Sequence, residues 1–106
     1  MATLGIVNYY AKVTIFYDAP CISFEVAPFG LRRLVNWLQE NYGKPIYVTE
    51  NGFSDYIGNT DDLQRIYYYK HYINQLLKAV KIDGVDVQGY YAWSLMDNFE
   101  WASGYT

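Results

Sequence analysis

A glutamate, Glu50, closes the strand-forming run "YVTE" (47–50) and is followed at once by Asn51 and Gly52. A carboxylate in this position is either an ordinary solvated strand end or a reagent that the fold holds in place. A placed carboxylate can add to an electrophilic carbon and later be displaced by water, which is nucleophilic catalysis. The side chains that the fold brings close to Glu50 decide between these two interpretations.

Three strands are predicted from the run of residue types. Residues 4–17 are β-branched and aromatic without a helical period, and the first half of this run is predicted to be a strand. Residues 45–50 form a second short strand between Pro45 and Gly52. Residues 85–95, "VDVQGYYAWSL", are predicted to be the third.

Two helices are predicted between these strands. The first has an apolar stripe at i, i+3, i+4 and i+7, and Gly43 and Pro45 end it. The second begins near Asn59 or Thr60 as its N-cap and ends at Gly84. The first stripe is Leu31, Leu34, Val35 and Leu38, and the face predicted for the second helix is Leu63, Ile66, Tyr67, Ile73, Leu76, Leu77 and Val80.

The resulting order is β-α-β-α-β, in which helical connections are long enough for right-handed crossovers between parallel strands. Ligands of such sheets bind outside the carboxyl ends of the strands. Polar and aromatic residues follow each predicted strand, so we expect them to gather at one rim. They are Asn8, Tyr9 and Tyr10 after the first strand, Glu50 and Asn51 after the second, and Trp93, Asp97, Asn98, Glu100 and Trp101 after the third.

Carboxylates, amides and indoles at one rim are suited to binding a sugar. Indole faces pack against the C–H face of a pyranose, while carboxylates and amides bind its hydroxyls. On composition alone, Trp93 and Trp101 are also open to interpretation as core aromatics. Glu100 lies between Phe99 and Trp101, where a charge without a partner is unfavourable, and this supports a ligand role.

Composition excludes several classes of protein. The chain has 106 residues, is 52% hydrophobic and has a net charge of −3, which gives no electrostatic signature for nucleic acid or an anionic membrane. Cys21 and His71 are single, so no internal disulfide and no His or Cys metal cluster is expected. No segment is apolar enough to span a bilayer. The first residues lack signal-peptide features, and the sequence assigns no compartment.

Other noticeable residues have ordinary structural interpretations. Tyr67, Tyr68 and Tyr69 are expected to pack a helix against the sheet rather than to form a binding platform. Asp61 and Asp62 are expected in the first turn of a helix, where the helix dipole favours anions, rather than as an acid/base pair.

Four segments resemble glycoside hydrolase family 1, the β-glucosidases and their relatives, including lactase-like and myrosinase-like enzymes. "PIYVTENG" resembles its nucleophile motif, and "GYYAWSLMDNFEWASGYT" resembles the segment that lines the sugar pocket. "PFGLRRLVNWLQENYGKP" is similar to the helix before the nucleophile strand, and "NYYA" to the end of the sixth barrel strand. The resemblance implies an α/β fold, a partial (β/α) TIM barrel with three parallel strands and two connecting helices. Residues 1–106 would be a single incomplete domain equivalent to the sixth to eighth β/α units.

The resemblance also implies roles in retaining hydrolysis of β-glucosides, without metal or organic cofactor. Glu50 would be the nucleophile, and Tyr10 the phenol that orients it. Asn8, Trp93, Glu100 and Trp101 would bind the sugar, and Asn51 would hold the strand end. The implied partner is a small-molecule β-glycoside, not nucleic acid or membrane, and the rest of the barrel is needed for closure.

Three departures from the family pattern leave alternatives open, one of them a connection from Tyr10 to Pro28 that is shorter than the family's usual loop. The Asn-Glu-Pro motif that carries the family's general acid/base is absent from these 106 residues, and two residues rather than one separate Gly5 from Asn8. The chain alone is therefore expected to be inactive. A non-catalytic sugar-binding or regulatory relative, and a non-functional truncated product, are the alternatives.

Overall fold

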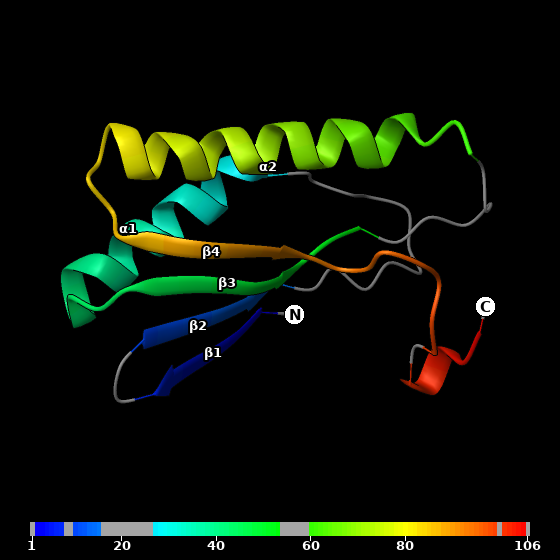
Figure 1. Cartoon of the computed structure of the whole chain (residues 1–106), viewed down its shortest axis with the longest axis horizontal. Helices are drawn as coiled ribbons and strands as arrows, with labels where there is room; N and C mark the ends of the chain where they lie inside the picture. Colours follow the sequence, from blue (N-terminus) through cyan, green and yellow to red (C-terminus); the bar gives the residue numbers. More distant parts are fainter. Residues whose placement is uncertain (1, 8–9, 16–26, 54–59, 100, 106) are drawn as a thin grey trace.

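The structure is a computed structural model that describes residues 2–7, 10–15, 27–53, 60–99 and 101–105. Four strands, two long helices and one short 3₁₀ helix make up the described part of the chain (Figure 1). In chain order they are β1 (Ala2–Val7), β2 (Tyr10–Ile15), α1 (Pro28–Tyr42), β3 (Ile46–Asn51), α2 (Leu63–Lys81), β4 (Val87–Ala92) and η1 (Trp101–Ser103).

The strands form one sheet in the order β1-β2-β3-β4. β2 is parallel to β3, and β3 is parallel to β4, so α1 and α2 connect parallel neighbours as predicted. Both helices lie on the same side of the sheet (Figure 1). The described part of the chain is thus a β-α-β-α-β unit with one extra strand in front of it.

The extra strand corrects the prediction for the first strand. Residues 4–7, from the first half of the run 4–17, belong to β1, which pairs antiparallel with β2 at the edge of the sheet. The strand beside β3 is formed by the second half of that run. A long β-forming segment can fold back on itself because antiparallel pairing needs only a short connection, whereas a parallel pair needs a long crossover.

α1 follows its predicted pattern. Leu31, Val35 and Leu38 are buried, and Leu34 packs against them at the edge of the core. Pro28 occupies the first turn, where its missing N–H has no helical partner to lose. Gly43 ends the helix in the left-handed region, at a φ of 57°, and its N–H donates to the carbonyl of Gln39 at 2.9 Å.

α2 begins and faces the core differently from its prediction. Asp62, not Asn59 or Thr60, is the N-cap, and its side chain accepts a hydrogen bond from the N–H of Arg65 at 3.3 Å. The aspartates therefore mark a helix start, as expected. The buried residues are Tyr68, Tyr72, Leu76 and Ala79, whereas Leu63, Ile66, Tyr67, Ile73 and Leu77 of the predicted face are exposed.

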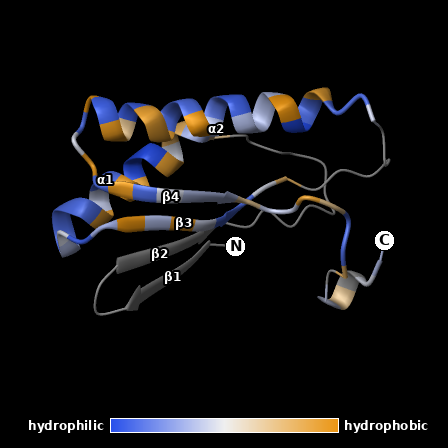
Figure 2. Ribbon diagram, in the orientation of Figure 1, coloured by the Kyte–Doolittle hydropathy of each residue, from blue (hydrophilic) through white to orange (hydrophobic). Residues whose placement is uncertain are grey.

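Two stacked tyrosine rings explain this difference. The rings of Tyr68 and Tyr72 lie 4.1 Å apart between α2 and the sheet, and both side chains are buried. A tyrosine ring buries more apolar area than a leucine side chain, and its hydroxyl can reach a polar partner at the core edge. Leu63, Ile66, Ile73 and Leu77 consequently lie on the exposed side of α2, whose ribbon Figure 2 shows with several hydrophobic segments.

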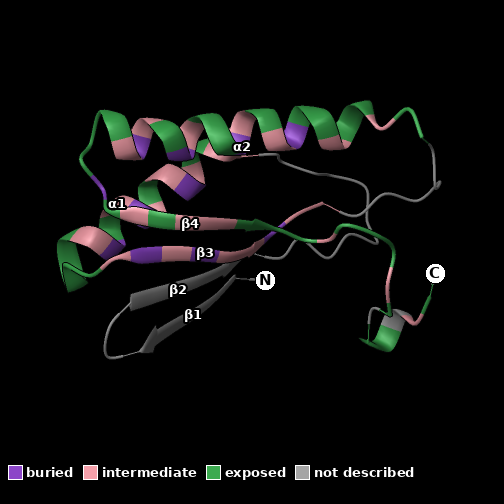
Figure 3. Ribbon diagram, in the orientation of Figure 1, coloured by how far each residue is buried: buried purple, intermediate pink, exposed green. Residues whose placement is uncertain are grey.

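The core lies between the helices and the sheet. Ile46 and Val48 of β3 are buried against the α1 and α2 side chains, and each such aliphatic residue contributes roughly 1.5–3 kcal/mol by its removal from water. Figure 3 shows burial concentrated in β3 and in the helix faces toward it, while the far end of β4 and η1 are exposed. No helix in the described ranges has the length and hydropathy needed to cross a membrane.

Candidate active site

The carboxyl ends of β3 and β4 lie side by side. Asn51 is paired with Ala92, and the N–H of Trp93 donates to the carbonyl oxygen of Asn51 at 2.9 Å. Parallel strands place Glu50 and Trp93 at the same end of the sheet for this reason. This is the rim at which the sequence predicts the site.

A bulge near the end of β3 sets the face on which Glu50 lies. Val13 of β2 pairs with Val48, but the next residue of β2, Thr14, pairs with Glu50, so Thr49 is an extra residue in β3. Val48 and Asn51 are therefore both buried on the helix side, although they are three positions apart in the strand. Because neighbouring strand residues point to opposite faces, Glu50 lies on the face away from the helices.

Asn51 is the one buried polar side chain in the described core, with an exposed fraction of 0%. Its Nδ2 donates to the hydroxyl of Tyr68 at 2.8 Å, and its Oδ1 accepts from the hydroxyl of Tyr90 at 2.7 Å. Burial, aided by the neighbouring Tyr69 and Tyr72, raises the pKa of Tyr90 far above its usual range, so its hydroxyl stays a proton donor. Both halves of the buried amide are thus satisfied.

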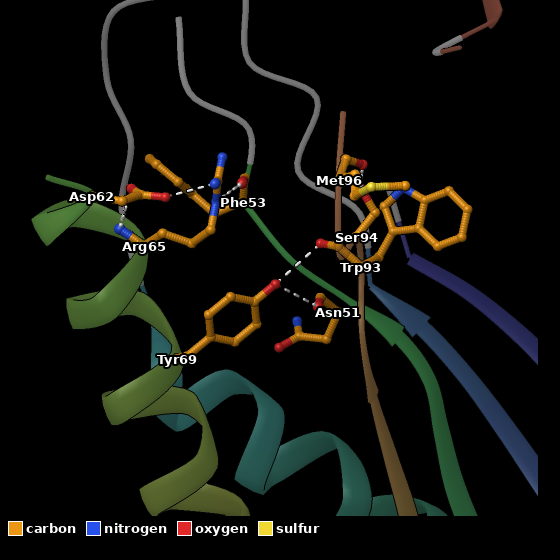
Figure 4. A network of polar contacts seen from close by, with 8 residues as sticks. All are labelled: Asn51, Phe53, Asp62, Arg65, Tyr69, Trp93, Ser94 and Met96. Atoms are coloured by element: carbon orange, nitrogen blue, oxygen red, sulfur yellow. Dashed lines mark hydrogen bonds and ion pairs between the residues drawn. The ribbon is translucent and has the colours of Figure 1, made fainter. Parts of the chain in front are cut away.

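Tyr69 connects the two strand ends from α2 (Figure 4). Its hydroxyl lies 3.0 Å from the carbonyl oxygen of Trp93 and 3.4 Å from that of Asn51. Burial is the main reason that the pKa of Tyr69 is raised. We refer to Asn51, Tyr68, Tyr69, Tyr90 and Trp93 as the strand-end network.

Two further contacts hold the chain around this network. Arg65, one turn before Tyr69, donates from Nε to the carbonyl of Phe53 at 3.1 Å (Figure 4). Gly52 leaves no room for a side chain, because a Cβ atom there would lie 1.7 Å from the carbonyl oxygen of Trp93. The sequence Glu50-Asn51-Gly52 is therefore fixed on both sides by α2 and β4.

Trp93 and Trp101 are not core residues. Trp93 is 42% exposed and Trp101 81% exposed, which corrects the interpretation of these indoles as core aromatics. After Trp93 the chain turns away from the sheet, and the Ser94 hydroxyl donates to the carbonyl of Met96 at 2.6 Å. η1, which carries Trp101, lies beyond the end of β4 and away from the helices (Figure 1).

Three other predicted site residues stand differently. Asn8 and Glu100 lie outside the described residues. Tyr10 begins β2, whose next residue, Ala11, pairs with Ile46 at the start of β3. Tyr10 is thus at the opposite end of the sheet from Glu50, which corrects the expectation that it approaches this carboxylate. The reason is that β1 and β2 run antiparallel, so the strand that pairs with β3 begins at Tyr10 instead of ending there.

Sequence reasoning missed Tyr68, Tyr69 and Tyr90 as members of the network. Tyr68 does pack α2 against the sheet as predicted, but its hydroxyl also binds Asn51. The available signal was a polar residue at a strand end combined with three consecutive tyrosines in the next helix. His71 lies on the ring of Tyr67 at 4.1 Å, and the described residues contain no group of three acidic, histidine or cysteine side chains that could hold a metal ion.

One surface hollow lies away from the strand ends. It is lined by residues of α1, by Gln75 of α2 and by Asp83, in the connection between α2 and β4. Glu50 and Trp93 do not line it. The strand ends are the stronger candidate for a functional site. The Glu50 carboxylate and the Trp93 indole lie there, next to the Asn51 amide, whose nitrogen and oxygen both have hydrogen-bond partners.

Comparison with known proteins identifies the family to which the chain belongs. The profile of the family described as Glycosyl hydrolase family 1 matches residues 9–106. Human lactase/phlorizin hydrolase is 60% identical over 81 residues, which are 76% of this chain and 4% of that protein. β-Glucosidase 1B of Phanerodontia chrysosporium is 53% identical over 83 residues, which are 72% of this chain and 15% of that protein.

Solved structures show the same relationship. A rice β-glucosidase matches with a TM-score of 0.73 and 42% identity, over 83% of this chain and 20% of that one. An aphid myrosinase matches with a TM-score of 0.74 and 39% identity, over 90% of this chain and 21% of that one. The chain therefore spans about a fifth or less of the relatives it matches, whose fold is the (β/α) TIM barrel. With a family match over nearly its whole length, the chain belongs to glycosyl hydrolase family 1.

Proposed function

We propose that this chain carries the nucleophile segment of a β-glucosidase-type site that hydrolyses β-glucosides with retention of configuration. The observation that carries the proposal is the position of Glu50 at the carboxyl end of β3, where Asn51 binds the N–H of Trp93 at 2.9 Å. This arrangement places a carboxylate and an indole at one rim of a parallel sheet. Family membership and the β-glucosidases among the relatives support the same reaction class.

In this reaction the Glu50 carboxylate attacks the anomeric carbon while the bond to the leaving oxygen breaks. The leaving oxygen takes a proton from a general acid. Water then gives its proton to the conjugate base and displaces Glu50, which restores the carboxylate and releases the sugar. The sequence Glu50-Asn51-Gly52 supplies the attacking group and its rigid support, and no cofactor takes part.

The remaining proposed roles concern sugar binding. The indole of Trp93 would form the floor beneath the sugar, while Asn8, Glu100 and Trp101 would bind its hydroxyls. Trp93 and Trp101 are accessible enough for this. Tyr10 has no part in the proposal, because it lies at the other end of the sheet from Glu50. The barrel units that the relatives possess beyond the matched fifth would complete the pocket.

The general acid determines which substrates can react. A retaining site needs two carboxyl groups about 5 Å apart, and the 106 residues contain no Asn-Glu-Pro segment for the second. General acid assistance is worth roughly 10²–10⁴-fold, and a leaving alkoxide depends on it most. We therefore expect no measurable hydrolysis of cellobiose by the 106-residue chain.

The test uses a substrate that needs no acid. After incubation with 2-deoxy-2-fluoroglucosyl fluoride, mass spectrometry of peptides is expected to find a fluoroglucosyl adduct on Glu50. Glu50→Gln abolishes the adduct, and Glu40→Gln, which changes an exposed carboxylate on α1, leaves it unchanged. An adduct on another residue, or cellobiose turnover that survives Glu50→Gln, would overturn the proposed function.

A further inference from the structure

We propose that Tyr69 is a positioning residue, whose hydroxyl holds the end of β4 against the end of β3 and so sets where Trp93 lies relative to Glu50. This deepens the proposed function and rests on it for the roles of Glu50 and Trp93. The holding contact itself is independent of those roles.

Two backbone carbonyl groups converge on the hydroxyl of Tyr69. The Tyr69 hydroxyl lies 3.0 Å from the carbonyl oxygen of Trp93 and 3.4 Å from that of Asn51 (Figure 4). A hydroxyl has one proton, so the shorter contact, to Trp93, is the stronger hydrogen bond. The carbonyl of Asn51 also accepts the N–H of Trp93. One side chain of α2 thus touches both strands at their last mutual contact.

This hydroxyl lies in a confined space beside Gly52. A Cβ atom at Gly52 would lie 3.1 Å from the Tyr69 hydroxyl and 1.7 Å from the Trp93 carbonyl oxygen. The glycine therefore lets α2, β3 and β4 approach one another at a single point. A side chain at residue 52 would separate these three groups.

Other side chains of α2 hold the helix against β3 and the residues just after it. Arg65 binds the carbonyl of Phe53 at 3.1 Å, and the Tyr68 hydroxyl accepts from Asn51 at 2.8 Å. These two contacts reach β3 and the residues just after it. Tyr69 of the same helix contacts the carbonyl oxygen of Trp93, so we infer that it transmits the position of α2 to the end of β4.

The consequence for Trp93 follows from its place in the chain. Residues after Ala92 leave the sheet, and Trp93 is the first residue beyond β4. Its N–H is held by β3 and its carbonyl by Tyr69. With both backbone groups bound, the direction in which the Trp93 indole leaves the backbone is fixed relative to β3, which carries Glu50.

The experiment compares Tyr69→Phe with Tyr67→Phe in the 106-residue chain. Tyr67 is exposed on the outer side of α2, so its hydroxyl serves as the matched control. Amide hydrogen exchange is measured at Trp93 and at Val48, which lies in the core. A net hydrogen bond is worth about 1 kcal/mol, so Tyr69→Phe is expected to speed exchange at Trp93 roughly fivefold and exchange at Val48 by no more than this. Tyr67→Phe is expected to change neither.

The second measurement separates positioning from general support. The rate at which 2-deoxy-2-fluoroglucosyl fluoride labels Glu50 is recorded against its concentration. In Tyr69→Phe the half-saturating concentration is expected to rise roughly fivefold, because Trp93 is less well placed under the sugar, while the limiting rate changes little. The urea midpoint of Tyr69→Phe is expected to fall by the equivalent of one hydrogen bond, and that of Tyr67→Phe to stay unchanged.

Each outcome decides the proposal. Unchanged exchange at Trp93, or a greater loss of protection at Val48 than at Trp93, overturns the positioning role of Tyr69. A loss of protection at Trp93 that equals or exceeds that at Val48 supports it. If exchange at Trp93 is faster in Tyr69→Phe but the unsubstituted chain is not labelled at Glu50, the contact of Tyr69 with both strand ends is confirmed and the proposed function is wrong.

Discussion

Glu50 and Asn51 are neighbours with opposite environments, and this contrast defines the site at the scale of the residue. Asn51 is fully buried and bonded at both ends of its amide, while Glu50 is half-buried and lies on the other face of β3. A buried amide without partners would be unfavourable by about 1–3 kcal/mol, so the two tyrosine hydroxyls are needed for Asn51 to be there. The buried support and the proposed nucleophile are thus adjacent residues of one strand.

Only part of this arrangement could be predicted from the sequence. The motif around Glu50 indicates a strand end with a functional carboxylate. Simple strand alternation, however, would place Glu50 on the same face as Val48, because the bulge at Thr49 leaves no signature in residue type. The tyrosine partners of Asn51 could not be predicted either, because the contact of Tyr68 depends on the rotation of α2 against the sheet and that of Tyr90 on the register between β3 and β4.

Gly52 gives a prediction at this scale. Gly52→Ala would place a Cβ atom 1.7 Å from a backbone oxygen of Trp93, which cannot move without shifting β4. We expect the free energy of unfolding to fall by about 1–3 kcal/mol, as for overpacked sites. Urea unfolding followed by circular dichroism measures this change.

Gly30→Ala is the matched control for that experiment. Gly30 lies in α1, and nothing is within 4 Å of the position its Cβ would take. Alanine in a helix is favoured over glycine by roughly 0.5–1 kcal/mol, so this variant is expected to gain stability. Equal effects of the two substitutions would show that β3 and β4 do not approach each other closely at Gly52.

At the scale of the element, α1 and α2 differ in how well their faces could be predicted. α1 buries aliphatic residues with a regular spacing, and the hydrophobic period alone identifies Leu31, Val35 and Leu38. α2 buries Tyr68 and Tyr72 together with Leu76 and Ala79, whereas a hydropathy pattern favours the side that carries most of its other aliphatic residues. Asn51 at the sheet end gives the Tyr68 hydroxyl a hydrogen-bond partner that the pattern does not contain.

The hairpin of β1 and β2 is the other element that the period did not reveal. Alternating β-forming residues from Ala2 to Ile15 are compatible with one long strand, two short strands or a strand and a loop. The choice decides which end of the sheet Tyr10 occupies. A sequence pattern specifies strand propensity, but register depends on the turn between the strands.

An ion pair between elements gives a prediction with pH. Arg32 of α1 binds Asp83, after α2, with Nε to Oδ2 at 2.6 Å and Nη2 to Oδ1 at 2.7 Å, and Asn36 adds a third hydrogen bond at 2.8 Å. The hydrogen bonds from Arg32, followed by that from Asn36, lower the pKa of Asp83 from 3.8 to about 2. A lowered pKa means that the folded state favours the charged form, so this stability is present above about pH 4 and is lost as the pH falls toward 2.

The measurement compares the unsubstituted chain with Asp83→Asn from pH 5 to pH 2. The urea midpoint of the unsubstituted chain is expected to be higher at pH 5 and to converge with that of Asp83→Asn as the pH approaches 2. Salt should reduce the difference, because both side chains are partly exposed. Glu40→Gln, on the exposed side of α1, is the control, and a gap between the unsubstituted chain and Asp83→Asn that persists at pH 2 would contradict the ion-pair explanation.

At the scale of the whole molecule, the described sheet is covered on one side only. α1 and α2 bury one face, while Tyr91 on the other face is 59% exposed. Among the described strands, β4 pairs with β3 alone, so its other edge presents unpaired backbone groups. Parallel strands are normally buried on both faces, and an exposed edge next to aromatic side chains favours association between chains.

The final prediction is that the 106-residue chain self-associates through β4 and its uncovered face. Sedimentation velocity at increasing concentration is expected to show a mass above the 12.4 kDa of the single chain. Tyr91→Lys places a charge on that face beside the open edge, and charged residues at such positions oppose edge-to-edge pairing. This variant is expected to return toward the monomer mass, whereas Tyr67→Lys, on the outer side of α2, is expected to associate like the unsubstituted chain. A concentration-independent monomer before any substitution would show that the uncovered face and edge do not drive association, and a shift toward the monomer with Tyr67→Lys alone would assign it to the helical side of the molecule instead.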